Sequence, residues 1–338
     1  MRWWVKAAIA GTCAHFPGGV SVYDRIRKRF GELAKFEDAD GFRNAVWFLE
    51  TVRRHCGRVQ KLKVIEFGTG WVPAVPFGCA LAGMEMLTVD VACLVESGIF
   101  ERFLDEAQRY LPELADAAGV EEQVMASRME TARQTAGFDQ AMQALGCAWQ
   151  APVDTTRLVE IPDDHGDLTI SNLVLQCIPK QIVPHVIAEL YRVTRPGGFS
   201  IHRMTMFDEY STSDPARNDL DYLRISEPRW NRWFSHRIKH LNRLRYSQFL
   251  ELLRAPGFEV VDCSRDIDRD SIPHLQQHGV AREFESLSWD DIATTTMQVV
   301  LRRPDECEER DSRSRSSVIP IQSLSASSPA MIHSDRSH

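Results

Sequence analysis

The chain has 338 residues, of which 43% are hydrophobic and 26% charged, and its formal net charge is −7. This composition can build a sizeable core, the length suggests about two domains or one α/β body with additions, and the negative charge argues against bulk electrostatic capture of nucleic acid. Eight cysteines stand singly, without a CxxC pair or a histidine at zinc-finger spacing. Neither a disulfide framework nor a metal site is therefore indicated.

Residues 1–57 are predicted to form a helical cap. The three expected helices cover residues 3–14, 22–33 and 40–55, with a break at the Pro-Gly-Gly of 17–19. In the third segment, apolar residues recur at the spacing of one helix face, at Phe42, Val46, Leu49 and Val52. Two interpretations stay open: the cap only packs on the core, or it also closes over a substrate.

The apolar beginning of the chain also has some features of a secretory leader. Lys6 interrupts this run and the run is short, so we predict a packed helix there. No other stretch approaches the roughly 18 continuous apolar residues that cross a bilayer. We therefore expect a cytoplasmic protein without a membrane partner.

The stretch Lys61–Asp90 predicts the ligand-binding half of an α/β fold. A short apolar strand over 62–67 runs into Gly68 and Gly70, where a ligand could approach a backbone that carries no Cβ. A helix is expected next, followed by a second strand over 86–89. Strand, glycine turn, helix and strand together indicate a cofactor half-site.

Two acids flank this glycine turn. Asp90 follows the second strand about twenty residues after the glycines, the spacing at which nucleotide-binding folds place a ribose-binding acid. Glu66 directly precedes the turn. A pyrophosphate would gain nothing from an anion at that place, whereas a cationic ligand would.

The residues EFGTGWV resemble motif I of the class I S-adenosylmethionine-dependent methyltransferases, written acid-x-Gly-x-Gly-x-Gly, with Val72 in place of the third glycine. S-adenosylmethionine carries a sulfonium and an amino group, which is the kind of ligand that Glu66 favours. The resemblance implies that Asp90 holds the ribose hydroxyls. The residues implied to line the methionine and ribose are Glu66, Gly68, Thr69, Gly70 and Trp71.

The next part of the chain is predicted to be helical, with an amphipathic helix over 94–110 and further helix up to Leu145. A short strand ending at Val153 follows. In the resembled family an acid at this place bonds the adenine amino group, so the resemblance implies an adenine site at Asp154 and Thr155. The residues alone leave a second interpretation open, in which Asp154 forms an Asx turn or a helix cap.

A second match to the same family begins at the turn residues 163–166. An apolar strand over 168–170 is expected to present Ser171 and Asn172 at its carboxyl end, beside the cofactor. The resemblance implies that these two residues form the floor beneath the sulfonium. The family often continues Leu-Glu-His-Ile, where residues 175–178 of this chain are Leu-Gln-Cys-Ile. Family roles of the Glu-His pair therefore do not transfer.

The remaining elements complete a seven-stranded sheet. ELYRVTRPGGFSIHRM resembles the family's junction between a helix and the fifth strand, with a glycine pair at the turn. The helices and strands expected in this part cover residues 180–193, 199–204, 247–254, 258–263 and 296–301. In the resembled family the last strand is antiparallel. We therefore expect an α/β fold over 58–304, a doubly wound, Rossmann-like methyltransferase sheet of seven strands with an antiparallel last strand.

Methyl transfer needs mainly the orientation of the acceptor toward an activated carbon, and a base only where the acceptor must lose a proton. The nearest titratable side chains lie in and after the fifth strand. We predict His202, Asp208 and Tyr210 as catalytic candidates. Strand alternation puts His202 on the same face as Met204, so this histidine either lines the pocket or belongs to the core.

Residues 224–245 carry seven Arg or Lys against one Glu, interleaved with aromatic side chains. This pattern suits nucleic acid, a lid over a small anionic substrate, or an insertion that packs its Trp residues on the core. In the resembled family the stretch after the fifth strand often shapes the substrate pocket. We therefore interpret 205–245 as a substrate-side insertion and favour substrate recognition over nucleic acid.

From Asp305 onward the chain is rich in serine and poor in large apolar residues, so we predict a disordered tail over 305–338. Taken together, these features predict an S-adenosylmethionine-dependent methyltransferase that acts on a small-molecule acceptor. Two alternatives stay open: a non-catalytic descendant of the fold that serves as a binding or scaffold module, and an NAD-dependent oxidoreductase. Glu66 and the terminal strand pair disfavour the oxidoreductase.

Overall fold

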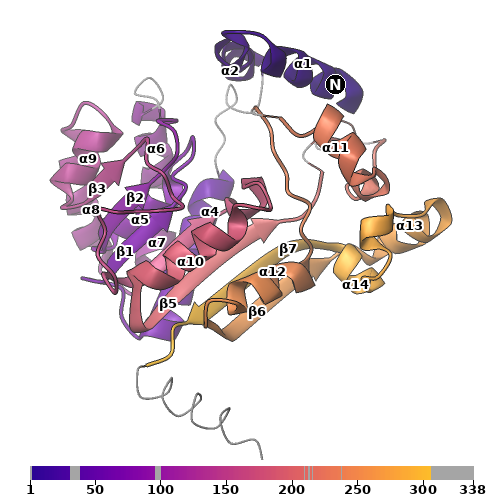
Figure 1. Ribbon diagram of the computed structural model, residues 1–338. Helices are drawn as coiled ribbons and strands as arrows, with labels where there is room; N and C mark the ends of the chain where they lie inside the picture. The colour runs from indigo at the N-terminus through magenta and orange to yellow at the C-terminus, as the bar shows by residue number, and fades with distance from the viewer. Residues whose placement is uncertain are drawn as a thin grey trace, which may run out of the picture. The chain divides into compact units, whose positions relative to one another are not determined.

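The strands of the protein form a single seven-stranded sheet in the order β3-β2-β1-β4-β5-β7-β6 (Figure 1). The computed structural model describes residues 2–30, 39–95, 100–208, 210–211, 214, 216–236 and 238–305. The strands are β1 (Lys63–Phe67), β2 (Glu85–Val89), β3 (Ala148–Gln150), β4 (Gly166–Asn172), β5 (Thr194–Thr205), β6 (Glu259–Ile267) and β7 (Thr294–Arg302). β7 runs antiparallel to both β5 and β6, and the other neighbours pair in parallel. The predicted fold class is confirmed.

Helices cover both faces of this sheet (Figure 1). The helices before β4 are α1 (Trp3–His15), α2 (Gly19–Phe30), α4 (Ala39–Cys56), α5 (Ala74–Leu81), α6 (Phe100–Arg109), α7 (Leu111–Ala118), α8 (Glu122–Arg133) and α9 (Phe138–Ala144). The later ones are α10 (Val183–Val193), α11 (Glu227–Trp233), α12 (Tyr246–Arg254), α13 (Ile272–His278) and α14 (Trp289–Ile292). Val64 packs with α4, α5 and α7 on one face, and Ile65 packs with α10 and α12 on the other. Because β1 is buried on both faces after Lys63, its residues do not alternate between apolar and polar, and Glu66 is the one charged side chain among the buried four.

Most predicted elements occur close to where the sequence placed them, although several differ at their ends; β5, for example, begins at Thr194 and not at residue 199. The strand expected to end at Val153 ends at Gln150. Pro152 lies directly beyond it and has no N–H to donate to a neighbouring strand. The helix expected over 94–110 begins at Phe100 in the described residues. The end of the second predicted helix (31–33) and the predicted tail from 306 onward lie outside the described residues.

The predicted cap contributes to three apolar clusters, one of which joins Ala10 and Cys13 of α1 to Tyr23 of α2. Phe42 and Phe48 of α4 are fully buried in the main core beside the sheet. Ala7 of α1 packs instead in a separate cluster that includes Tyr222 and Trp230 from the segment after β5. Phe284, from the segment between β6 and β7, completes that cluster. Two insertions far apart in the sequence thus share one small apolar core with the first helix.

Within the ranges that the structure describes, no helix combines the length and the apolar character needed to cross a bilayer.

Candidate functional site

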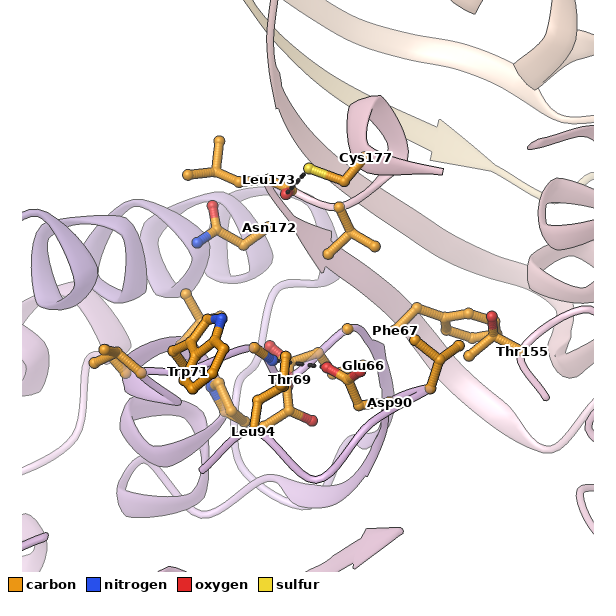
Figure 2. Close-up of a pocket in the computed structure, with 18 of the residues that line it drawn as sticks. Glu66, Phe67, Thr69, Trp71, Asp90, Leu94, Thr155, Asn172, Leu173 and Cys177 are labelled. Atoms are coloured by element: carbon orange, nitrogen blue, oxygen red, sulfur yellow. Dashed lines mark hydrogen bonds between the residues drawn. The ribbon is translucent and has the colours of Figure 1, made fainter. Parts of the chain in front are cut away.

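A cavity of about 500 Å³ lies at the carboxyl ends of β1, β2 and β4 (Figure 2). The ligand-binding crevice of an open α/β sheet is expected at this edge. Eight of the ten predicted cofactor residues line the cavity: Glu66, Gly68, Thr69, Gly70, Trp71, Asp90, Thr155 and Asn172. Figure 2 shows Trp71 and Thr155 at opposite ends, with Glu66 and Asp90 between them. The lining brings together segments that are more than a hundred residues apart in the chain.

The glycine turn after β1 needs glycine for two separate reasons. Gly68 and Gly70 both have positive φ, +84° and +69°, which side chains with a Cβ rarely adopt. A Cβ on Gly68 would also clash with the side chain of Val174, whereas a Cβ on Gly70 would meet nothing within 4 Å. The N–H of Gly68 donates to the carbonyl of Val89 at 2.7 Å, which holds the turn against the end of β2. Backbone therefore forms the edge of the cavity at this point.

The two predicted acids lie in the same cavity and have different environments. Asp90 accepts hydrogen bonds from the N–H groups of Gly70 (2.8 Å) and Ala92 (3.0 Å), so it orders the glycine turn directly. Glu66 is only 2% exposed. Burial raises the pKa of the Glu66 carboxyl well above its usual range, and the nearby Asp90 carboxylate raises this pKa further. A cation placed between them would favour the ionised form of Glu66.

Three buried oxygen atoms of residues that line the cavity have no hydrogen-bond partner among the described residues. They are Oε2 of Glu66, Oγ1 of Thr69 and Oδ1 of Asn172. Buried polar atoms of folded proteins are nearly always paired, and leaving one unpaired costs about 1–3 kcal/mol. All three atoms can accept a hydrogen bond. A ligand that carries donors or positive charge would satisfy all three atoms.

Several lining residues were not among the predicted site residues. Gly41, at the start of α4, lines the cavity and gives the N-terminal region a direct part in it. Val174, Cys177 and Ile178 form a wall after β4. The match to the family's Leu-Glu-His-Ile segment pointed to this region, and Cys177 stands at the histidine position. Gln176, which stands at the family's glutamate position, is buried and does not line the cavity. Its Nε2 donates to the hydroxyl of Thr205 at 3.3 Å.

The predicted adenine pair is divided. Thr155 lines the cavity, but Asp154 does not. The Oδ1 atom of Asp154 accepts from the N–H of Thr156 at 2.9 Å and from its hydroxyl at 2.6 Å. These bonds lower the pKa of the Asp154 carboxyl and form the Asx turn that was the alternative interpretation of this residue. An adenine contact of Asp154 stays a prediction.

Ser171 and His202 lie inside the sheet and not on the cavity. Both are fully buried, and Nδ1 of His202 lies 2.8 Å from Oγ of Ser171. Nε2 of His202 lies 2.7 Å from Oγ of Ser200. The hydrogen bonds continue from Oγ of Ser200 to Oγ1 of Thr169 at 2.5 Å, and from there to Oγ1 of Thr194 at 3.0 Å. The pair that was expected beside the cofactor and the acceptor is thus part of a hydrogen-bonded row between β4 and β5.

The direction of this row is fixed at its far end. The hydroxyl of Thr194 donates to the carbonyl of Leu190 at 2.6 Å, and a carbonyl can only accept. Each hydroxyl has one proton, and the Thr194 hydroxyl has already donated its own, so it must accept from the hydroxyl of Thr169. By the same rule, Thr169 accepts from the hydroxyl of Ser200, and Ser200 accepts from Nε2–H of His202. Nδ1 must then accept from the hydroxyl of Ser171. The row holds His202 neutral in one tautomer, and burial lowers the pKa of the imidazole to about 3.

This environment predicts an acid-sensitive fold. The folded-state pKa of His202 lies below the unfolded value of 6.5, so the unfolded state binds the proton more readily as the pH falls below 6.5. Protonation of His202 in the unfolded state should therefore lower the free energy of unfolding by about 2 kcal/mol between pH 7 and pH 5. Urea unfolding should show this loss in the wild type and in His165→Gln, an exposed histidine, but a smaller loss in His202→Gln. Equal losses in all three proteins would contradict this assignment.

The other two catalytic candidates, Asp208 and Tyr210, also lie away from the cavity. Asp208 is fully buried, pairs with Arg217 at 2.7 Å and accepts from the N–H of Tyr210 at 2.8 Å. Burial raises the pKa of the Asp208 carboxyl, while the charge of Arg217 opposes the rise. The hydroxyl of Tyr210 donates to the carbonyl of Phe234 at 3.3 Å. None of the three predicted catalytic residues lines this cavity, and their catalytic role stays a prediction.

The basic and aromatic segment 224–245 contributes no lining residue to the cavity either. Trp230 is buried and donates its indole N–H to the carbonyl of Leu241 at 3.1 Å. Arg243 is buried and pairs with Glu227 (2.6 Å) and Glu283 (3.1 Å). Trp230 thus packs in the small apolar core, as the third interpretation of the pattern expected, whereas Trp233 is exposed. Substrate recognition by 205–245 stays a prediction.

No protein-family model and no curated protein matches the sequence. Many solved structures are similar in fold, at low identity. An S-adenosylmethionine-dependent methyltransferase from Mesorhizobium loti is 16% identical, over 77% of this chain and 98% of that chain, with a TM-score of 0.41. A SAM-dependent methyltransferase from Methanosarcina mazei is 12% identical, over 73% and 94%, with a TM-score of 0.37. The [4+2]-cyclase SpnF is 16% identical, over 77% and 81%, with a TM-score of 0.41.

Proposed function

We propose that the chain binds S-adenosylmethionine in this cavity and transfers its methyl group to a small-molecule acceptor. The observation that carries the proposal is the buried Glu66 oxygen without a partner, in a cavity whose other charged lining group is Asp90 among the described residues. Two carboxylates in a largely buried site attract a cationic ligand and repel a pyrophosphate. This supports a sulfonium nucleoside over a nicotinamide dinucleotide.

The residues present fit such a cofactor. Glu66 and the unpaired oxygens of Thr69 and Asn172 would accept from its amino group or face its positive charge. Asp90 has acceptor capacity beyond its two backbone bonds, because each carboxylate oxygen can accept more than once, and this capacity suits ribose hydroxyls. Thr155, at the opposite end of the cavity from Trp71 (Figure 2), marks the expected adenine side.

When bound, the cofactor supplies a methyl carbon that its sulfonium leaving group has already activated. The contribution of the protein is then position and the exclusion of water. Gly68 and Gly70 let the backbone approach the ligand, and Asp90 keeps their turn in shape. Leu173, Val174 and Ile178 form an apolar wall that limits access of water beside Asn172. Gly41 places the start of α4 at the same cavity, where a substrate-covering cap would act.

Calorimetric titration with S-adenosylhomocysteine and with NAD tests the cofactor, and transfer of labelled methyl from S-adenosylmethionine into a mixture of small metabolites tests the reaction. We expect S-adenosylhomocysteine to bind and NAD not to bind, with label appearing in a small molecule. Binding of NAD alone would overturn the proposal in favour of an oxidoreductase. Binding of S-adenosylhomocysteine without any methyl transfer would favour a scaffold module.

A further inference from the structure

Exposed apolar side chains gather on the first two helices and α11. Among the described residues, eleven large apolar side chains are exposed, and five of them belong to this region: Trp4, Phe16, Val22, Ile26 and Trp233. Trp4 and Trp233 are the most exposed of the five, at 59% and 62%. Trp4, Phe16 and Trp233 line one groove, and contiguous exposed apolar groups of this kind mark interaction sites. We call this region the α1–α2–α11 surface.

The two parts of this surface are in direct contact. The ring of Trp3 on α1 lies 5.9 Å from the ring of Phe234 at the end of α11. A Cβ built on Gly11 would lie 4.0 Å from the carbonyl of Trp233. Between the helices is an apolar groove of about 860 Å³, floored by small residues such as Ala7, Ala8 and Gly11 and walled by tryptophan rings. Figure 1 shows α1 and α2 lying next to each other, with α11 close to α1.

The N-terminal part of the chain, which contains α1 and α2, has a net charge opposite to that of the remaining chain. Residues 2–30 contain six Lys or Arg and one Asp, a net charge of +5, which leaves −12 for the rest because the whole chain carries −7. The described side chain of Arg25 is exposed on α2, and Arg229 and Arg232 are exposed on α11. The guanidinium of Arg232 lies 5.3 Å from the ring of Trp233, so charge and aromatic surface coincide.

We infer that the α1–α2–α11 surface docks on anionic lipid bilayers, with its tryptophans at the headgroup level and its cations against the lipid phosphates. Tryptophan is enriched at membrane–water interfaces, and a basic amphipathic helix binds in the plane of the interface. Juxtaposed cations each add attraction to an anionic leaflet. The net charge of −12 on the remaining chain would be repelled by that leaflet. This repulsion orients the protein with the α1–α2–α11 surface toward the bilayer. This inference departs from the expectation of no membrane partner, because a peripheral contact needs no spanning helix.

Sedimentation of the full chain with unilamellar vesicles tests this inference. One set of vesicles is pure phosphatidylcholine, and the other contains one third phosphatidylglycerol. We expect binding at least tenfold stronger to the anionic set, weaker binding at high salt, and a blue shift of tryptophan emission on binding. Trp4→Ser with Trp233→Ser should weaken binding to the anionic vesicles by about tenfold or more. Arg229→Gln with Arg232→Gln should weaken it by roughly fivefold for each charge removed.

Val159→Ser with Val261→Ser is the matched control, because both side chains are exposed and lie outside this surface. This control should bind anionic vesicles as the wild type does. All variants change exposed side chains, and unchanged circular dichroism and melting temperature confirm that each is folded. The inference is overturned if the wild type does not bind anionic vesicles at low salt, or if the tryptophan variant binds as well as the control. It is also overturned if a single-stranded oligonucleotide binds more tightly than the vesicles, or if the tryptophan variant only dissociates a dimer of the wild type.

Discussion

Glu66→Gln is expected to weaken the binding of S-adenosylmethionine by roughly 10- to 100-fold, the range that corresponds to one hydrogen bond with a charged group. Gln keeps the size of the side chain and one acceptor oxygen but removes the charge. Glu66 is buried and lines the cavity, so its interaction with a cation is weakly screened by solvent. Calorimetric titration of the wild type and the variant measures the change directly.

The pH dependence of the same titration provides a second, independent test. Burial and the nearby Asp90 raise the pKa of Glu66, so the empty protein keeps a protonated Glu66 up to a higher pH than an exposed carboxyl would. A cationic ligand binds the ionised form, so affinity should rise as the pH rises through this pKa, and binding should release protons. The variant should lack this dependence. Glu85→Gln, at the exposed start of β2, should behave as the wild type, and a similar loss in both variants would contradict a specific role for Glu66.

The cofactor side of the site could be predicted from the sequence because local chain geometry fixes it. Glu66 and the two glycines lie within five consecutive residues, and Asp90 ends the next strand of the same unit. In parallel pairing, Glu66 aligns with Thr88, so the two acids must reach the same edge of the sheet. The order of strand, turn and strand is sufficient to bring these groups together. Asn172 follows the same rule on the adjacent strand β4.

The surroundings of His202 could not be predicted from the sequence, because strand alternation does not tell which face of a strand lies toward a cavity. His202 lies in register with Ser171, and both point into the layer under α10 and α12 and not toward the ligand edge. The polar row of Thr169, Ser171 and Ser200 resembles an alternating surface strand in sequence. Only the pairing of β4 with β5 shows that these hydroxyls satisfy one another and the histidine.

The charged residues of segment 224–245 also could not be placed from the sequence alone. Seven cations suggested a ligand-binding face, but Arg245 is fully buried and donates to five acceptors. These are the hydroxyl of Tyr222 and the backbone carbonyls of Met206, Asp291, Ile292 and Thr294. The carbonyls come from three separate parts of the chain, namely the end of β5, α14 and the start of β7. Arg245 thus joins the two insertions to the sheet, an assignment that requires the tertiary structure.

Arg245→Ala should therefore destabilise the protein strongly. Removing the guanidinium leaves several buried carbonyls without a donor and opens a cavity, and the loss of one partner from a buried charged network typically costs about 3–5 kcal/mol. Denaturant unfolding should show a decrease of this size in the free energy of unfolding. Arg254→Ala, on the exposed side of the same helix, is the matched control and should change stability by less than about 0.5 kcal/mol. A loss below about 1 kcal/mol for Arg245→Ala would show that the insertions are held to the sheet by their apolar core alone.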